Sequence, residues 1–485
     1  MNTPSSIRYT RTQRDGRLRF STKLFQGIGA IPDTVKNWVF NTFILLFYSQ
    51  ILGVDALMVS TVLAVALIFD ALTDPIVATI SDNLHTRWGR RHPLMLLGAL
   101  PLGFCFYPIF SPPEGLSSMA LCLWLLTFVL LTRLAMTFYF IPWAAIAAEL
   151  SDDYEERTSV MAFRYAVGWT IAVTFPLFVY SYLIVGTPEH PVGQLNGANY
   201  PAMAMAAAFL MTVGGVTTTL LTRREIPFLR QHAVAPARPG IANVLREIAD
   251  AMRNEQFALV FAVVLILAVV GGTTTNLNIY MTTFFWGLTS EDLRWFVISA
   301  IGAVVAFPLV ALVQRRWDKK HIMIACSLVS LFDGMAIVSL RFFDLLPENG
   351  DPMLLKLLVG AGVFAVGLAV IQGVIGASII ADVLDYHEMK TGLRQEAMFN
   401  AALSFSGKAA SGIGIVMGGV LINFIAMPPN TLPADVPADV ITRLGVMVGL
   451  VLPLLYLLPI YLMRHYRISR QMLQDVQAAL GRSKG

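Results

Sequence analysis

Long apolar runs, separated by short polar segments, dominate the chain from Val35 to Met463. Each run holds roughly 20 residues, the length that an α-helix needs to cross a bilayer. Hydropathy divides the 485 residues into twelve predicted spans. In the first half the spans are 31–52, 57–80, 93–111, 117–149, 160–185 and 200–221. In the second half they are 256–285, 293–313, 321–340, 353–381, 397–425 and 438–463.

The composition supports a polytopic α-helical membrane protein. Hydrophobic residues make up 56% of the chain and charged residues only 14%, whereas soluble domains contain about 25% charged residues. The mean hydropathy is +0.65. The three cysteines lie singly within apolar runs, which excludes a disulfide framework or a clustered thiolate metal site. The histidines share no metal-ligand spacing, so we expect no metal site beyond one for a coupling ion.

The positions of lysine and arginine predict the orientation. With the N-terminus inside, the inner segments carry 27 of the 35 basic residues and the outer loops carry four. Such an excess is typical of cytoplasmic loops. We therefore expect a multi-pass inner-membrane protein with both termini in the cytoplasm. The formal charge of +4 reflects these loops and is not a sign of nucleic-acid binding.

Two loop motifs occur twice and indicate a duplicated six-helix unit. "RWGRRH" at 87–92 recurs as "RWDKKH" at 316–321, and "DYEER" at 153–157 is echoed by "DYHEMK" at 385–390. Each pair lies between corresponding spans of the two halves.

The predicted domain organisation follows from the spans and this repeat. A cytoplasmic tail (1–24) precedes the N-terminal bundle (25–221), a linker (222–255), the C-terminal bundle (256–463) and a second tail (464–485). In the linker, "IANVLREIADAM" has the periodicity of an amphipathic helix on the inner membrane surface.

Two carboxylates in the second span are the first candidates for function. "FDALTDP" at 69–75 places Asp70 and Asp74 one turn apart on one helix face, with Thr73 beside them. An unpaired carboxylate in hydrocarbon costs several kcal/mol, so such residues are usually paired or functional. Carboxylate and hydroxyl oxygens suit Na⁺ or Li⁺, and a proton could take the place of the metal ion. The alternative is a structural charge pair with Lys408 or Arg133.

Three cations within the spans admit two interpretations each. Lys408 in "SFSGKAASG" either neutralises the acids of the empty state and releases them later, or forms a static salt bridge. Arg133 in "LLTRLAMTF" either binds an acidic group of a solute through its bidentate guanidinium or is a permanent partner of Asp70 or Asp74. Lys36, near the start of span 1, either extends to the membrane surface or contacts a solute.

The motifs resemble those of a known transporter family. Twelve spans in two repeats, with a basic loop after span 2, resemble the major facilitator superfamily. "DALTDP" at 70–75, "RWGRRHP" at 87–93 and "ADVLDYHEMKTGLRQEAMF" at 381–399, followed by Lys408, resemble the glycoside–pentoside–hexuronide:cation symporters. The resemblance covers nearly the whole chain and implies an all-α major facilitator fold with two six-helix pseudo-repeats.

The resemblance implies roles for individual residues. The family's cation site falls on Asp70, Thr73, Asp74 and Thr137. The substrate-binding candidates are Thr34, Arg133, Phe140, Trp143, Arg164 and Lys408. The cytoplasmic charge network of the facilitators falls on Asp82, Arg87, Arg90 and Arg91, or these residues merely set the topology.

Several of these positions depart from the sugar-specific pattern. Thr34 and Phe140 stand where the galactoside-binding relatives have acids, and Arg133 replaces a small residue. Phe140 and Trp143 offer a stacking platform for a sugar or an apolar wall for an acyl chain, or they pack within the bundle.

These features predict a monomeric secondary transporter. Its function would be Na⁺- or H⁺-coupled symport of a small glycoside- or uronate-like solute by alternating access, with Arg133 favouring an acidic group on the solute. The alternative within the transport class is a carrier of lysophospholipid or another amphiphile, because the related lysophospholipid symporters keep the span-2 acid beside a less polar pocket. No catalytic constellation or nucleotide-binding loop is recognisable, so neither an enzyme nor an ATP-driven pump is expected, and no cofactor apart from the coupling cation.

Overall fold

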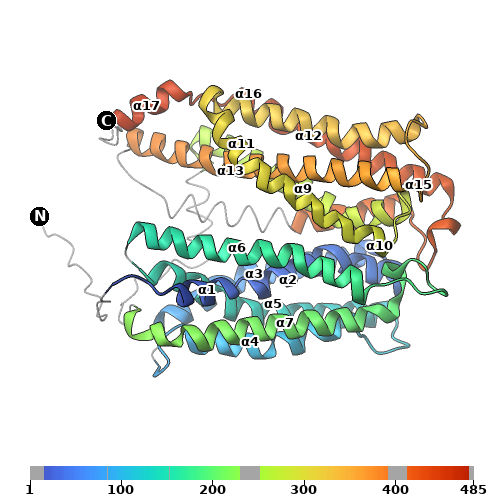
Figure 1. The fold of residues 1–485 in the computed structure, drawn as a ribbon, viewed down its shortest axis with the longest axis horizontal. Coiled ribbons are helices and arrows are strands. Elements are labelled where there is room, and N and C mark those ends of the chain that lie inside the picture. Colours follow the sequence, from blue (N-terminus) through green and yellow to red (C-terminus); the bar gives the residue numbers. More distant parts are fainter. Residues whose placement is uncertain (1–15, 85, 152, 230–251, 392–411, 480–485) are drawn as a thin grey trace, which may run out of the picture. The chain divides into compact units, whose positions relative to one another are not determined.

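A computed structural model describes the chain in five stretches: 16–84, 86–151, 153–229, 252–391 and 412–479. These residues form helices and connecting loops without any β-strand. They belong to two compact units, Met1–Gly240 and Ile241–Gly485, drawn in blue to green and in yellow to red in Figure 1. The division falls within the predicted linker. Most of that linker lies outside the described residues, so its amphipathic helix stays a prediction.

The N-terminal unit is built from seven α-helices among its described residues. They are α1 (Phe20–Ile28), α2 (Ile31–Val39), α3 (Ala56–Asn83), α4 (His92–Phe106), α5 (Ser118–Glu149), α6 (Tyr154–Phe178) and α7 (Tyr200–Thr222). Short π- or 3₁₀-helical segments extend four of them: η1 (Phe40–Ile44) and η2 (Phe47–Ile51) after α2, η3 (Tyr107–Phe110) after α4, η4 (Val179–Leu183) after α6 and η7 (Arg223–Phe228) after α7.

The C-terminal unit has a similar construction. Its main helices are α9 (Glu255–Tyr280), α10 (Ser290–Leu293), α11 (Ala300–Arg316), α12 (Lys319–Phe342), α13 (Pro352–Thr391), α15 (Ala438–Gly445), α16 (Leu457–Arg464) and α17 (Arg470–Ala479). The π-helix η8 (Met281–Phe285) extends α9, and η9 (Arg294–Ser299) joins α10 to α11. The segments η11 (Val446–Val451) and η12 (Leu452–Tyr456) connect α15 to α16.

Ten helices of the described residues are long and apolar enough to cross a membrane, against twelve predicted spans. The predicted span 1 is the helix formed by α2, η1 and η2, which π-helical turns interrupt. The predicted span 11 is only partly described, as the apolar helix Gly412–Ile425. The first span is not counted because its helix is irregular, and the eleventh because only part of it is described. The apolar runs themselves lie where they were predicted.

Local signals fix the helix that carries the two carboxylates. The Asp55 side chain caps α3 by accepting hydrogen bonds from the backbone N–H groups of Leu57 (2.9 Å) and Met58 (3.0 Å). Pro75 lies within α3, directly after Asp74. A proline lacks the N–H that would bond to the carbonyl four residues earlier, so the carbonyl oxygen of Ala71, directly after Asp70, lacks its usual helical partner.

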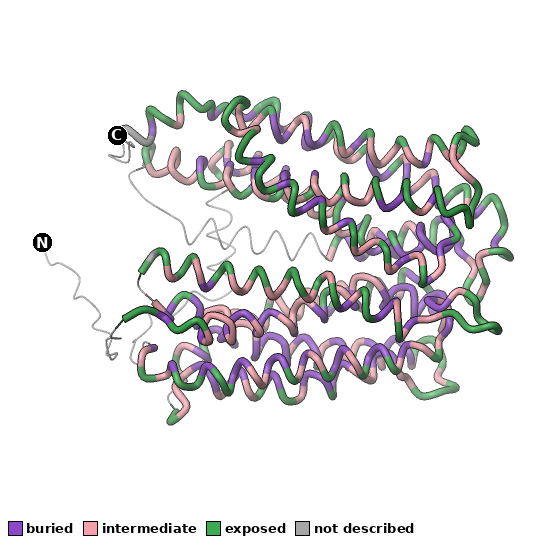
Figure 2. The backbone as a smooth tube through the Cα atoms, viewed as in Figure 1, coloured by how far each residue is buried: buried purple, intermediate pink, exposed green. Residues whose placement is uncertain are grey.

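Large apolar side chains lie exposed along the helices of both units. Phe104, Phe209, Val304 and Phe332 are all more than 60% exposed. Exposed positions recur along the length of the helices in Figure 2 instead of being confined to loops. A water-soluble protein rarely exposes apolar surface on this scale, whereas helices that face lipid do so along their whole length.

Candidate functional site

The two span-2 carboxylates face α5 and meet two of its polar side chains. Arg133 Nη1 donates to Asp70 Oδ2, and the two groups form an ion pair. One turn further along both helices, Thr137 Oγ1 donates to Asp74 Oδ1 at 3.1 Å. The i and i+4 positions of α3 thus match the i and i+4 positions of α5. We call Asp70, Thr73, Asp74, Arg133 and Thr137 the coupling cluster.

The Asp70–Arg133 pair is shielded from solvent yet incompletely satisfied. Arg133 is 8% exposed and the Asp70 side chain 15%. Asp70 Oδ1 and Arg133 Nε are buried without a hydrogen-bond partner in the described structure. The guanidinium also lies 5.8 Å from the centroid of the Phe40 ring. Asp70 therefore has its charge balanced and keeps one carboxylate oxygen for a further ligand.

Thr73 contributes an oxygen but not a free proton. Its hydroxyl donates to the backbone oxygens of Phe69 (3.0 Å) and Asp70 (3.4 Å) within α3. A hydroxyl that donates to its own helix still has a lone pair to offer. Together with the carboxylates and Thr137, it supplies the hard oxygen ligands that a small monovalent cation requires.

A second feature of the N-terminal unit is a cavity of about 530 Å³ between α2, α5 and α6. Thr34, Phe140, Trp143 and Arg164, four of the predicted substrate-binding residues, all line it. Tyr165 and Trp169 add two more aromatic side chains. We call this space the solute cavity. The structure thus brings together residues that lie up to 130 positions apart in the sequence.

Arg164 is the cationic group of the solute cavity. Its guanidinium carbon lies 3.7 Å from the centroid of a Trp143 ring, which holds the group by cation–π attraction. Its Nη1 lies 3.6 Å from the Met161 sulfur, and it makes no ion pair within the described part of the chain. A guanidinium held against an aromatic ring can keep its donors for a ligand.

Asp33 also lines the solute cavity, and the sequence interpretation did not include it. Its carboxylate pairs with Lys36 at 3.2 Å, one helical turn away on α2. Lys36 is only 9% exposed, so it stays at Asp33 instead of extending to the surface. The family resemblance pointed to Thr34. An acid in the neighbouring position of the same turn was the signal that could have revealed Asp33.

Two predicted substrate-binding residues are not placed in the solute cavity. Arg133 does not line the cavity, and the structure pairs it with Asp70, the second of its two predicted alternatives, so its contact with a solute stays a prediction. The reason is the register of α3 and α5, which sets the guanidinium opposite the carboxylate. Lys408 lies outside the described residues, so its switching role stays a prediction.

The predicted inner-loop charges form a buried network at the ends of α3, α4 and α5. Arg91 pairs with Asp82 (3.0 Å) and with Glu149 (2.6 Å), and Arg90 also pairs with Glu149 (2.7 Å). Glu149 was missed by the sequence interpretation, although a lone acid at the end of an apolar span was a visible signal. Arg87 is exposed, and among the described residues it joins no ion pair.

The second basic loop makes a comparable contact in the C-terminal unit. Lys319 of "RWDKKH" pairs with Asp382 on α13, with Nζ–Oδ distances of 2.7 and 2.5 Å. Each unit therefore joins its basic loop to an acid near the end of a long helix. This agrees with the duplication inferred from the sequence.

Comparison with known proteins identifies the family. Residues 25–470 match the family model described as MFS/sugar transport protein. The inner membrane symporter YicJ of Escherichia coli is 24% identical over 84% of this chain and 82% of its own length. The isoprimeverose transporter of Lactiplantibacillus pentosus is 25% identical over 79% of this chain and 76% of its own length.

A solved structure shows the same fold. The crystal structure of the nucleoside transporter NupG aligns with a TM-score of 0.62 over 93% of this chain and 100% of that one, at 13% identity. These findings confirm the predicted all-α major facilitator fold and exclude an enzyme. The chain belongs to the MFS/sugar transport protein family, a family of membrane transporters.

Proposed function

We propose that this protein is a cation-coupled symporter of a small, polyhydroxylated solute that carries an acidic group, such as a hexuronate or a glycoside of one. The solute binds in the solute cavity, and Na⁺ or H⁺ binds at the coupling cluster. Transport proceeds by alternating access in the cytoplasmic membrane, with both termini inside. The symporter and isoprimeverose-transporter names of the two relatives support symport of a sugar-type solute.

Arg164 is the main reason for proposing an acidic group on the solute. It is a cation inside a cavity walled by aromatic side chains, and within the described residues it makes no ion pair, although its charge interacts with that of Asp33 in the same cavity. Lys36 already neutralises Asp33. A solute carboxylate would complete the charge balance through a bidentate contact. The aromatic rings would cover the apolar face of a sugar ring, and Asp33 and Thr34 would bond its hydroxyls.

The coupling cluster suits one monovalent cation. The five residues of the cluster contain two carboxylates and one guanidinium, a charge balance that accommodates one Na⁺ or H⁺. Asp70 Oδ1, buried and without a partner in the described structure, is an oxygen that such a cation would satisfy. The cation would be held by Asp70, Asp74, Thr73 and Thr137.

Helix α5 connects the two sites. Thr137 belongs to the coupling cluster, and Phe140 lines the solute cavity three residues later. Three residues correspond to about 4.5 Å along a helix axis. A change in α5 on cation binding would therefore reach the solute cavity through a rigid element, which is what coupling requires.

The test is uptake by the purified protein in liposomes. Labelled D-glucuronate, methyl β-D-glucoside and lysophosphatidylglycerol are offered under an inward Na⁺ or H⁺ gradient. We expect accumulation of glucuronate. Arg164→Gln should weaken glucuronate binding at least about thirtyfold, because breaking a buried charged contact costs about 2 kcal/mol or more.

The matched control is Arg443→Gln, which removes an exposed arginine paired with Asp439 at 2.9 Å outside the cavity. It should leave uptake unchanged. Preferential uptake of the lysolipid would favour an amphiphile carrier. An Arg164→Gln protein that still binds glucuronate normally would refute the assignment of the acidic group.

A further inference from the structure

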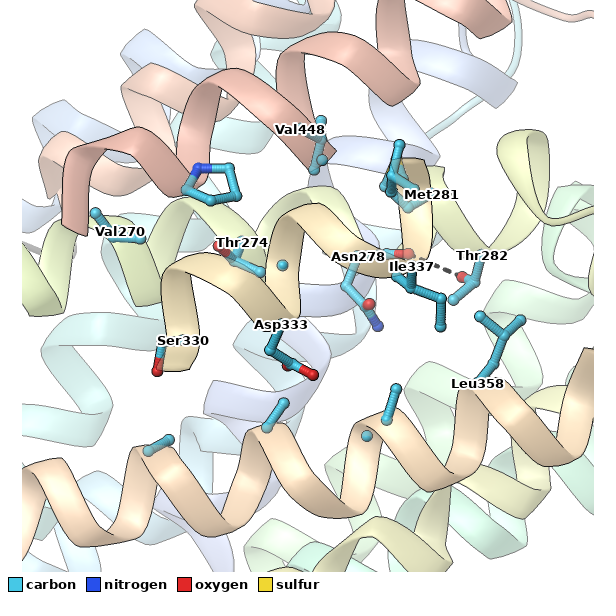
Figure 3. A pocket seen from close by; sticks show the side chains of 18 of the residues that line it. Val270, Thr274, Asn278, Met281, Thr282, Ser330, Asp333, Ile337, Leu358 and Val448 are labelled. Carbon is cyan, nitrogen blue, oxygen red and sulfur yellow. Dashed lines mark hydrogen bonds between the residues drawn. The ribbon is translucent and has the colours of Figure 1, made fainter. Parts of the chain in front are cut away.

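The C-terminal unit contains a cavity of about 280 Å³ that has no role in the function proposed above. Its walls come from α9, α12 and α13, with η11 and η12 at one side (Figure 3). All of these elements belong to one unit, so the cavity is defined without reference to the N-terminal unit. In the following it is called the second cavity.

Asp333, in the middle of α12, is the acid of this cavity. Figure 3 shows its carboxylate pointing from α12 into the space that the Asn278 amide also enters from α9. In the part of the chain that the structure describes, Asp333 has neither a hydrogen bond nor an ion pair. An acidic group within a membrane span and without a partner indicates a functional site, because leaving it uncompensated costs several kcal/mol.

The other polar groups among the described residues of the second cavity are neutral. Thr274 and Asn278 lie one turn apart on α9, and Gln372 Nε2 donates to Ser330 Oγ at 3.4 Å. No lysine or arginine is among the residues described as lining the cavity, which disfavours a carboxylate, sulfate or phosphate ligand. With Asp333 as the one acid among the described lining residues, these residues also lack the charge that a divalent metal ion requires. Amides, hydroxyls and a single carboxylate suit a ligand rich in hydroxyl groups.

Size and shape narrow the ligand further. A volume of 280 Å³ corresponds to about nine water molecules at roughly 30 Å³ each, which suits one small ring with its hydroxyls. Trp286 and Phe296 supply flat apolar surface, and Ala361 and Ala365 on α13 leave the space open. Aromatic walls with a few convergent polar groups are the usual construction of a small-molecule site.

We propose that the second cavity binds a neutral, polyhydroxylated ring, with Asp333 as the principal acceptor of its hydroxyl hydrogens. The inference rests on the proposed transport of a polyhydroxylated solute. It adds a site in the C-terminal unit whose charge preference is opposite to that of the solute cavity. The solute cavity, with Arg164, favours an acidic ring. The second cavity, with Asp333, repels one.

Site-specific alkylation tests the proposal. Ala365→Cys places a thiol in the second cavity at an exposed position, while the native cysteines Cys105, Cys122 and Cys326 are buried. The purified full-length protein is treated with N-ethylmaleimide, and labelling at position 365 is followed by mass spectrometry. D-Glucose, D-xylose and methyl β-D-galactoside are the neutral probes, and D-glucuronate and NaCl are the charged ones.

We expect at least one neutral sugar to slow labelling, about tenfold at ten times its Kd, because occupancy sets the rate. Glucuronate and NaCl should give no protection. Adding Asp333→Asn should abolish the protection, and so should Ala361→Leu, which fills the cavity and keeps the acid. Adding Asp33→Asn should leave it intact, since that residue belongs to the solute cavity.

Three results would overturn the proposal: no protection by any neutral sugar, protection that survives Asp333→Asn, or equal protection by NaCl. If no neutral sugar protects position 365 while glucuronate uptake in liposomes is normal, only the proposed ligand of the second cavity is refuted. If the natural protein does not take up glucuronate but neutral sugars still give Asp333-dependent protection, the proposed function of the solute cavity is refuted instead.

Discussion

Arg133 determines the charge of the coupling cluster. Without it, two carboxylates one turn apart on α3 would leave two negative charges in the bundle. Its pairing with Asp70 balances one of these charges and leaves Asp70 Oδ1 without a partner in the described structure. The buried guanidinium is also costly to leave alone, because desolvated charges require partners. We therefore propose that Arg133 acts in cation binding and that Arg164 recognises the acidic group of the solute.

A double-mutant cycle measures this pairing. Arg133→Gln and Asp70→Asn should each destabilise the protein by about 3–5 kcal/mol, the range for breaking a buried ion pair. The double variant should lose clearly less than the sum of the two, since neither charge is then left alone. Thermal unfolding in detergent gives the three values. Additive losses would show that the two side chains do not act as a pair. Arg133→Gln should also alter cation affinity while leaving the preference for acidic over neutral solutes unchanged.

Sequence reasoning points to residues whose signal is local. Helical spacing places Asp70 and Asp74 on one face, and buried charge is rare in a span, whereas Thr137 was named through the family resemblance; the structure places it beside Asp74. Asp33 and Asp333 were not identified. Their significance depends on which cavity they enter, and this is set by helix packing that no short motif encodes. Arg133 was left between two interpretations for the same reason: its partner lies on another helix.

At the scale of elements, α4 and α5 approach each other at a glycine. A Cβ built on Gly98 would lie 2.4 Å from the Ala135 carbonyl oxygen and 2.6 Å from the Tyr139 nitrogen. Both obstacles are backbone atoms and cannot rotate away. Since α5 also carries the coupling cluster and part of the solute cavity, this contact fixes the helix on which both sites depend.

Gly98→Ala should therefore destabilise the protein by about 1–3 kcal/mol, the cost of overpacking a tight contact. Thermal unfolding in detergent measures the loss. The matched control is Gly271→Ala on α9, where a new Cβ meets nothing within 4 Å and should be neutral or stabilising. Equal effects of the two substitutions would contradict the close α4–α5 approach.

The charge network that joins the ends of α3, α4 and α5 depends on Glu149. Glu149→Gln keeps the shape of the side chain but removes the charge that Arg90 and Arg91 share. We expect a loss of about 3 kcal/mol, at the low end for a broken buried pair, because Arg91 keeps Asp82. Glu155→Gln, an exposed acid in the first turn of α6, is the control. If Glu149→Gln leaves the stability unchanged, these charges only set the topology.

The spans themselves were predictable because apolar length is a strong signal. Most ends agree within a few residues, as for α5 and for α15 to α16. The π-helical turns of the first span were not predictable, since they depend on how α2 packs against its neighbours. The length of α13 was also underestimated. Its polar inner end, with Asp382, continues the helix beyond the apolar run.

At the scale of the whole molecule, the duplication in the sequence has a structural counterpart. Each of the two units joins a basic loop to a buried acid, through Arg90 and Arg91 with Glu149 in one and through Lys319 with Asp382 in the other. The two units differ in their cavities. The N-terminal one carries a guanidinium at Arg164, and the C-terminal one a carboxylate at Asp333. Repetition of the scaffold thus accompanies divergence of the sites.

The central claim, that Asp70 and Asp74 couple cation entry to solute accumulation, is tested most directly by uptake in liposomes. Labelled D-glucuronate is measured with and without an inward Na⁺ or H⁺ gradient, for the natural protein and for Asp70→Asn and Asp74→Asn. The natural protein should concentrate the solute when the gradient is present. Both variants should bind solute and equilibrate it without concentrating it. Normal gradient-driven accumulation by both variants would contradict the account.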